Sequence, residues 1–269
     1  MGLRINSNIP ALNANRQTRQ TANRILRGFE GLSSGLRINR ARDDAAGLAI
    51  AENLRSQLRQ LNAEVNSLQS GVNAAQTAEG GLATQTDAVQ RLRELSVQAA
   101  NGTMSDEGRA ALNEEAQQLL DQIGATAEQT TFNGMGLLDG SQTTVPLDAE
   151  GNVALELNES TVDSLGLTGV DISTQAGAED AIGRLDAALE NIGQNRASLG
   201  AQQNRFEYGI ENRENSAVNA AESESRIRDL DVARATIEQT RNQILLQAGI
   251  GALAQSNLVG QRALQLLGG

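Results

Sequence analysis

Apolar residues recur at steps of three and four along most of this chain of 269 residues, and this spacing places them on one face of a helix. The longest run keeps a repeat of about 3.5 residues, which is typical of a coiled-coil seam. Its members are Leu54, Leu58, Leu61, Val65, Leu68, Val72, Ala75, Leu82, Val89 and Leu92. We therefore expect a long helix from about residue 45 to residue 99.

Similar spacing predicts helices on either side of this one. An apolar stripe over residues 5–36 predicts a first helix that ends near the cluster Ser33-Ser34-Gly35. Ser105 is followed by two acidic residues, as expected of an N-cap, and predicts a short helix over about residues 105–129. Asn101-Gly102 predicts the stop before it, with Gly102 in the left-handed conformation.

The second half of the chain returns to helix at about residue 179. Its apolar positions predict a long helix over about residues 179–222. We expect a joint near residues 223–225 and a last helix that runs towards residue 267. The seam of this last helix starts at Ile227, Leu230 and Ala233 and continues through Ile237, Thr240, Ile244 and Ala248.

The segment between the halves has a different pattern. Residues 143–145 and 153–157 flank a turn at residues 148–152, which predicts a β-hairpin in a region of about residues 140–175. Residues 165–172 predict one more short strand. The predicted fold class is mainly α: an elongated antiparallel helical bundle or coiled coil with a small β-hairpin region.

Composition argues against catalysis. The chain contains no His, Cys, Trp or Lys, so nucleophile–base pairs that use His, thiol chemistry and the usual zinc motifs are excluded. We expect no enzyme activity, no cofactor and no metal. Residues 1–60 carry a net charge of +6, residues 61–225 carry −19 and residues 226–269 carry +2. An acidic middle does not favour nucleic acid, and no apolar run is long enough to span a bilayer.

Several motifs together resemble bacterial flagellin. They include residues 3–11 (LRINSNIPA), 32–39 (LSSGLRIN), 41–50 (ARDDAAGLAI), 90–98 (QRLRELSVQ) and 131–134 (TFNG). In the second half they are residues 227–231 (IRDLD), 244–249 (ILLQAG) and 264–267 (LQLL). The resemblance covers roughly residues 1–140 and 165–269. The short separation between the halves resembles a minimal flagellin that lacks the large variable outer domains.

The resemblance implies three parts: an N-terminal inner-tube helix with its connecting spoke (residues 1–44), a rod-like outer domain (residues 45–222) and a C-terminal inner-tube helix (residues 223–269). It also implies three sets of site residues. Those for inner-tube assembly are Ile5, Ile9, Leu12, Ile25, Phe29, Leu32, Leu36, Ile227, Leu230, Ile237, Ile244, Leu253, Leu264 and Leu267. Those of the spoke, for contacts between subunits, are Arg37, Arg40, Arg42, Asp43 and Asp44. Those of a host-receptor surface are Gln90, Arg91, Leu95 and Glu115.

The residues of the last two sets also have ordinary structural explanations. The spoke charges also fit a solvated charge run, and the receptor positions also fit packing between subunits. The implied function is a structural subunit that polymerises into the flagellar filament for motility. The implied partners are further copies of the chain, an export chaperone on the C-terminal helix, filament cap and junction proteins, and the animal Toll-like receptor for flagellin.

The resemblance further implies an extracellular filament protein, and no apolar signal-peptide core follows Met1, so we expect export without a cleaved signal peptide. Two alternatives of other kinds remain at this point. A hook–filament junction protein shares the terminal architecture of flagellin. A cytoplasmic coiled-coil scaffold would form discrete oligomers instead of an open-ended polymer.

Overall fold

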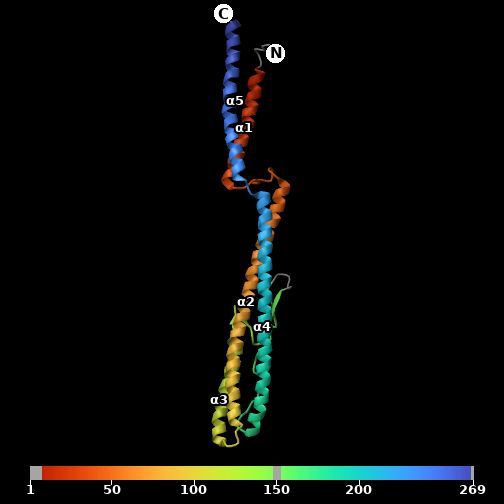
Figure 1. Ribbon diagram of the computed structural model, residues 1–269, viewed down its shortest axis with the longest axis vertical. Coiled ribbons are helices and arrows are strands. Elements are labelled where there is room, and N and C mark those ends of the chain that lie inside the picture. Colours follow the sequence, from red (N-terminus) through yellow and green to blue (C-terminus); the bar gives the residue numbers. More distant parts are fainter. Residues whose placement is uncertain (1–7, 148–152, 268–269) are drawn as a thin grey trace. The chain divides into compact units, whose positions relative to one another are not determined.

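The computed structural model describes residues 8–147 and 153–267, and the side chains within these ranges as far as residue 258. Figure 1 shows a mainly helical chain, which confirms the predicted fold class. The helices are α1 (Ile9–Ser34), α2 (Ala45–Ala99), α3 (Asp106–Gln129), α4 (Gln175–Arg228) and α5 (Val232–Leu267). The strands are β1 (Thr131–Phe132), β2 (Met135–Gly136), β3 (Thr144–Pro146) and β4 (Ala154–Glu156). The predicted turn at residues 148–152 lies outside the described residues.

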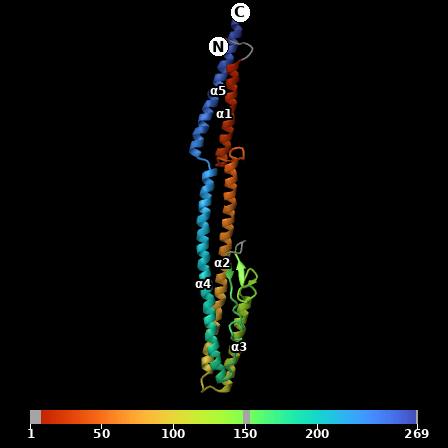
Figure 2. The same ribbon diagram turned by 90° about the vertical axis from the view of Figure 1, so that its right-hand side faces the viewer.

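The chain forms two compact units. One combines the two ends of the sequence, Met1–Leu58 with Val218–Gly269, and the other is Arg59–Ala217. In the second unit α2 and α4 lie side by side and antiparallel, as Figures 1 and 2 both show. Ion pairs mark the alignment: Arg93 meets Asp186 at 2.6 Å, and near the other end Arg213 meets Glu64 at 2.7 Å.

The predicted seam of α2 is the core of this second unit. Leu68, Val72, Leu82, Val89 and Leu92 are all buried. They pack with buried residues of the other helices and of the region between the halves, which are Ala116, Leu120, Ile123, Leu155, Leu157, Leu185, Ile192, Leu199 and Phe206. Leu and Ala supply most of this core, so helix backbones approach closely with few aromatic side chains between them.

Helix α3 folds back along α2 and is held there by a buried polar group. The side chain of Gln85, on α2, donates through Nε2 to the carbonyl oxygens of Ile123 at 3.2 Å and Ser160 at 2.8 Å. Its Oε1 accepts from the Ser160 hydroxyl at 2.6 Å. Because every polar atom of this buried amide has a partner, the network ties α2, α3 and the segment after β4 together without an unpaired group.

The predicted β-hairpin is confirmed, and a second one was not predicted. Strands β3 and β4 pair antiparallel with Val145 opposite Leu155. Strands β1 and β2 pair around Asn133 and Gly134, both with positive φ (51° and 79°). An Asn-Gly pair is the usual signal for such a two-residue turn, so the sequence did contain the evidence for this hairpin.

The strand predicted over residues 165–172 is wrong. This segment forms turns, because Gly166 and Gly169 adopt positive φ of 69° and 72° and break the extended path. Leu165, Leu167 and Ile172 are nevertheless buried in the core of the second unit. The alternating apolar pattern was therefore a sign of burial, not of strand pairing.

Two predicted helix ends also differ from the structure. Gly102 is not among the described glycines with positive φ. The end of α2 is instead closed by the buried Arg109 of α3, which donates to the carbonyl oxygens of Ala99 at 2.9 Å and Asn101 at 3.1 Å. The joint expected near residues 223–225 lies slightly later, at residues 229–231, since α4 continues to Arg228 and α5 begins at Val232. Serine alone did not stop a helix whose residues still had packing partners.

Replacement of Phe206 should destabilise the second unit strongly. The Phe206 side chain is 1% exposed, and Phe206→Ala is expected to lower the free energy of unfolding by about 3–5 kcal/mol through the cavity it leaves. Tyr208→Ala is the matched control, because Tyr208 lies two residues away on α4 and is 74% exposed. Urea unfolding followed by far-UV circular dichroism measures both. Equal effects of the two substitutions would contradict the assignment of Phe206 to the core.

Candidate assembly site

The pairing of α1 with α5 is made mostly by small and polar residues. The two helices lie side by side in the first unit (Figures 1 and 2). On α5, the buried and half-buried positions recur at steps of four and three: Ala235, Gln239, Asn242, Leu246, Gly249, Leu253 and Ser256. On α1, the corresponding heptad positions are Ala11, Ala14, Thr18, Thr21, Ile25, Gly28 and Leu32. Such side chains let the backbones approach but bury little apolar area.

The predicted inner-tube residues divide between this seam and the outside of the pair. Ile25 is buried, and Leu32, Leu36, Ile227, Leu230 and Leu253 are half-buried. Leu12 (63% exposed), Ile237 (71%) and Ile244 (61%) face away from the partner helix and, like Ile9 and Phe29, are more than half exposed. Ile5 and the side chains of Leu264 and Leu267 lie outside the described part of the chain. The exposed members are therefore not buried within one chain, and their burial between subunits stays a prediction.

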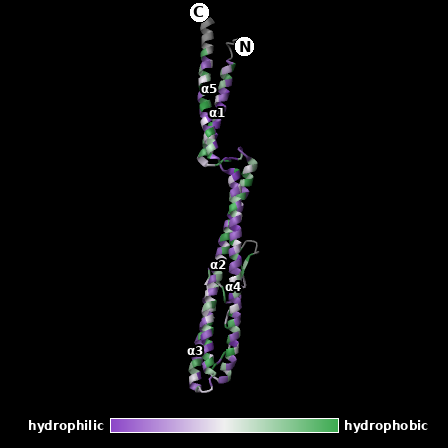
Figure 3. Ribbon diagram, in the orientation of Figure 1, coloured by the Kyte–Doolittle hydropathy of each residue, from purple (hydrophilic) through white to green (hydrophobic). Residues whose placement is uncertain are grey.

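The outward face of α5 is apolar over several turns. Ile237, Ile244 and Leu258 occupy equivalent positions of the heptad, opposite the seam that faces α1. Side chains of Thr236, Ile237, Thr240, Arg241, Ile244 and Leu245 line a shallow groove on this face. Hydrophobic segments recur along α5 in Figure 3. Leu26, Leu245 and Ile250 are also exposed. They were not among the predicted assembly residues, because they lie off the apolar stripe of their helix.

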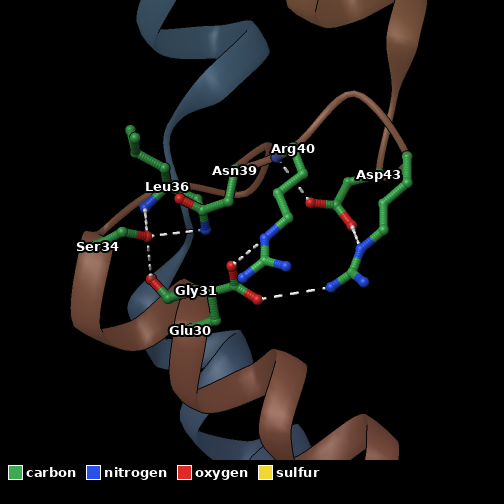
Figure 4. A network of polar contacts seen from close by, with 8 residues as sticks. Glu30, Gly31, Ser34, Leu36, Asn39, Arg40 and Asp43 are labelled. Carbon is green, nitrogen blue, oxygen red and sulfur yellow. Dashed lines mark hydrogen bonds and ion pairs between the residues drawn. The ribbon is translucent and has the colours of Figure 1, made fainter.

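The loop between α1 and α2 begins with a left-handed glycine cap. Gly35 has φ of 71° and donates its backbone N–H to the Gly31 carbonyl oxygen at 2.9 Å. The Ser34 hydroxyl then accepts from the backbone N–H of Leu36 at 3.2 Å and from the Asn39 amide at 2.9 Å (Figure 4). These bonds fix the direction in which the chain leaves α1.

Four charged side chains form one network at this loop, with Glu30 of α1 at its centre. The Arg40 guanidinium contacts Glu30 at 2.6 Å, and Arg42 lies 3.7 Å from Glu30 and 3.7 Å from Asp43. Asp43 also accepts from the Arg40 backbone N–H at 3.0 Å. The two arginine side chains are more than half exposed, so this network is solvated in the isolated chain and contributes little there.

The other two predicted spoke residues have partners within the chain. Asp44 accepts from the backbone N–H of Gly47 at 2.8 Å and thereby caps α2. Arg37 donates from its side chain to the Ile227 carbonyl oxygen and from its backbone to that of Arg228, at 2.7 Å for the latter. A role of these residues between subunits remains a prediction.

The loop is joined to the segment before α5. Leu36 and Asp229 form an antiparallel bridge, and the Leu230 N–H donates to the Gly35 carbonyl oxygen at 2.9 Å. Ile38 lies two residues after the bridged Leu36, and its buried side chain is close to Gly47 of α2. Sequence reasoning missed Ile38, because one apolar residue inside a charged run carries no periodic signal.

The predicted receptor residues lie at the α2–α3 face of the second unit. The Arg91 guanidinium contacts Glu115 at 2.8 Å and Glu94 at 3.1 Å. Hydrogen bonds to Glu115 and then to Glu94 raise the pKa of Arg91 above its ordinary value. Gln90 is exposed, but Leu95 is 1% exposed and belongs to the core. Leu95 can support this surface but does not present its side chain on it.

The described residues contain neither a metal-binding cluster nor a membrane-spanning helix. No group of three or more Asp and Glu side chains there is arranged to hold a metal ion. None of the helices searched is long and apolar enough to cross a membrane. The candidate functional features are thus the exposed apolar faces of α1 and α5 and the charged loop after α1.

Comparisons with known proteins decide the family. Residues 5–143 match the bacterial flagellin N-terminal helical region, and residues 182–267 match the bacterial flagellin C-terminal helical region. A flagellin from Halalkalibacterium halodurans is 44% identical over 269 residues, covering 98% of this chain and 99% of the relative.

The chain belongs to the bacterial flagellin family. Flagellin FlaB1 of Treponema pallidum is 40% identical over 283 residues and covers the same shares, 98% and 99%. The solved structure of Bacillus cereus flagellin aligns at 31% identity with a TM-score of 0.48, over 54% of this chain and 86% of that one. The resemblance inferred from the motifs is confirmed, and flagellins are structural proteins, in agreement with the composition.

Replacement of Gly35 tests the cap at the end of α1 in this flagellin. Nothing lies within 4 Å of a Cβ added at Gly35, so Gly35→Ala meets no side chain and only the left-handed backbone opposes it. We expect a loss of roughly 1 kcal/mol in the stability of the first unit. Gly251→Ala, also with open space around the added methyl, should raise helix stability by up to about 1 kcal/mol.

Thermal melting followed by far-UV circular dichroism, with amide hydrogen exchange to locate the change, measures both effects. Opposite signs are expected from the same chemical substitution. A stabilising effect of Gly35→Ala would show that the backbone there does not require the left-handed conformation.

Proposed function

We propose that this chain is a structural subunit of a bacterial flagellar filament and that it polymerises through the outward apolar faces of α1 and α5. The observation that carries the proposal is the exposure of large side chains on both helices, Leu12, Ile237 and Ile244 among them. Large apolar side chains exposed in this number on neighbouring helices mark an interaction site. Family membership agrees, since the relatives that span almost the whole chain include flagellins and a flagellar filament core protein of Treponema maltophilum.

Energetics favour burial of these faces by neighbouring copies. Full burial of one Ile or Leu side chain stabilises by about 1.5–3 kcal/mol, and the α1–α5 seam buries few such residues itself. Further copies of the same chain can supply the missing apolar partners. When the two contacting faces differ, as α1 and α5 do, the contact repeats in one direction and gives an open polymer wherever its rotation does not close a ring.

The three-part division fits this arrangement. Residues 1–44 and 223–269 would form the inner tube and the spoke, and residues 45–222 the outer part of each subunit. In the spoke, Arg40, Arg42 and Asp43 surround Glu30 and are still partly exposed. Burial by a neighbouring subunit would strengthen these ion pairs, because the effective dielectric constant falls as water is excluded.

Family membership also supports the proposed partners. The apolar face of α5 needs cover before polymerisation, and an export chaperone on this helix would provide it. A filament cap and junction proteins would meet the same faces at the two ends of the polymer. We place the protein outside the cell, in the filament. A junction protein and a cytoplasmic scaffold are less favoured, because flagellins match the chain at almost full coverage.

Exposed residues at the α2–α3 face support a second, dependent proposal. Gln90, Arg91 and Glu115 would contact the animal Toll-like receptor for flagellin, with Leu95 supporting them from the core. Arg91 and Glu115 side chains are each about half exposed and already paired. A pair of this kind presents both a donor and an acceptor to a partner.

Substitution of two isoleucines tests the assembly proposal. Ile237→Gln with Ile244→Gln removes apolar surface, while Gln is at least as good a helix former as Ile. We expect unchanged helix content of the soluble chain and a critical concentration for polymerisation raised at least about tenfold. Electron microscopy after seeding with short filament fragments measures the outcome.

Glu238→Gln is the control for this double variant, because it introduces the same residue on α5 at an exposed polar position. It should polymerise like the parent chain. Filaments from the double variant at the parental concentration would contradict the proposed interface. Discrete particles from the parent chain itself would favour the junction protein or the scaffold.

Alanine substitution at Arg91 tests the receptor proposal. Arg91→Ala should weaken binding of the receptor ectodomain by about tenfold, as expected for an arginine central to an interface. Arg93→Ala is the control, since Arg93 lies on the same helix but pairs with Asp186 of α4. Surface plasmon resonance with soluble chain measures both. Parental affinity of Arg91→Ala would leave subunit packing as the explanation of this surface.

A further inference from the structure

Two contacts across the α1–α5 seam each join a polar side chain of one helix to a glycine of the other. Gln239 of α5 lies over Gly28 of α1, where a methyl group on the glycine would overlap the glutamine Oε1. Thr18 of α1 lies over Gly249 of α5, where an added Cβ would stand 2.8 Å from the threonine Oγ1. The glycine of each helix therefore receives the side chain of the other.

The two contacts belong to one alignment of the helices. Thr18 and Gly28 are ten residues apart on α1, and Gln239 and Gly249 are ten residues apart on α5. A third contact continues the antiparallel order, because the Asn8 side chain donates to the Ser256 carbonyl oxygen at 3.1 Å. Matched spacing on two antiparallel helices is the requirement for both contacts to form together.

Gln239 is an unfavourable choice for a seam if stability alone mattered. It is 6% exposed, its Nε2 donates to the Ile25 carbonyl oxygen at 3.4 Å, and its Oε1 has no partner. A buried amide oxygen without a donor is unfavourable. Single polar residues in a coiled-coil seam lower stability but select one register and one partner.

Other registers lose both glycine contacts. If one helix slides by one heptad, Gln239 meets either Thr21, which is buried and carries a Cβ, or Gly35, which lies beyond the end of α1. The same slide places Thr18 opposite Asn242 or Ser256 instead of Gly249. One shifted alignment therefore puts two side chains at both contacts, and the other puts two side chains at Thr18–Ser256 and leaves Gln239 beyond the end of α1.

We propose that the Gln239–Gly28 and Thr18–Gly249 pairs are positioning contacts that set the register of α1 against α5. The register in turn determines how Leu12 on α1 and Ile237 and Ile244 on α5 are placed relative to one another on the outside of the pair. That consequence rests on the proposed filament function, whereas the register itself does not.

Engineered disulfides read the register directly, because the chain has no cysteine of its own. The Cβ added at Gly249 would lie 3.8 Å from the Thr18 Cβ, which is the separation that a disulfide prefers. Full-length chain carrying Thr18→Cys and Gly249→Cys reports the observed register. Thr18→Cys with Asn242→Cys, and Thr18→Cys with Ser256→Cys, report the registers shifted by one heptad.

The expected result is an intrachain disulfide that forms about tenfold faster in the first cysteine pair than in either shifted pair. Gly28→Ala in these backgrounds should bring the rates within about twofold of each other. Gln239→Leu should do the same while helix content is retained, so unfolding would not explain the loss. Gly251→Ala is the control and should leave the tenfold preference unchanged, because open space surrounds its added methyl.

The disulfide rates are measured on soluble chain and on the product of seeded growth, with peptide mapping to separate intrachain from interchain bonds. Equal rates in the three parental pairs, no disulfide in the Thr18/Gly249 pair, or an unchanged preference in both Gly28→Ala and Gln239→Leu would each overturn the register proposal. The expected preference without filaments would support the register and remove the filament function. Filaments without a register preference would do the reverse.

Discussion

The first unit depends on how α1 meets α5. A seam made mostly of small and polar residues brings two backbones close together but buries little apolar area. Many large apolar side chains of both helices are left on the outside of the pair, Ile237 and Ile244 most clearly. Had the same isoleucines filled the seam, the pair would be more stable alone and would have less reason to associate. The placement of small residues inside is therefore what creates the assembly surface.

The loop after α1 and the segment before α5 extend this dependence. Two backbone contacts join the α1–α2 loop to the segment between α4 and α5. They are the antiparallel bridge between Leu36 and Asp229 and the hydrogen bond from the Arg37 N–H to the Arg228 carbonyl oxygen. Neither segment is a free linker, because backbone groups of each are partners of the other. Movement at one would break hydrogen bonds at both, so the ends of the sequence are constrained together within the first unit.

Sequence periodicity predicted the helices well but did not reveal the seam between the two terminal helices. The α2 seam was found because Leu68, Val72 and Leu82 repeat without interruption and are also buried. In α1 and α5 the same rule followed the largest apolar residues, while the pairing seam runs through residues such as Thr18, Gly28 and Gln239. Hydrophobic periodicity predicts which side chains are buried in the functional assembly. It does not show whether the same chain or a neighbouring copy buries them.

The remaining errors have local causes. Arg109 closes the end of α2 from a neighbouring helix, and spacing in the sequence did not reveal that long-range capping bond. Leu165 and Leu167 alternate like a strand, but the positive φ of Gly166 turns the chain between them. The Asn133-Gly134 turn, by contrast, follows a known rule and was available to a closer reading. Both tertiary partners and local glycine conformations therefore account for what periodicity missed.

The two units differ in how far they complete their own cores. The second unit buries Phe206, Leu185, Ile123 and many other large side chains. In the described part of the first unit, the buried apolar residues are only Ile25, Ile38, Ala51 and Ala220. Since most helical stability comes from packing an apolar face, the second unit can fold by its own contacts and the first cannot reach the same stability alone. In the proposed assembly, such a subunit would complete its first unit against its neighbours, which would couple folding of the ends to growth of the polymer.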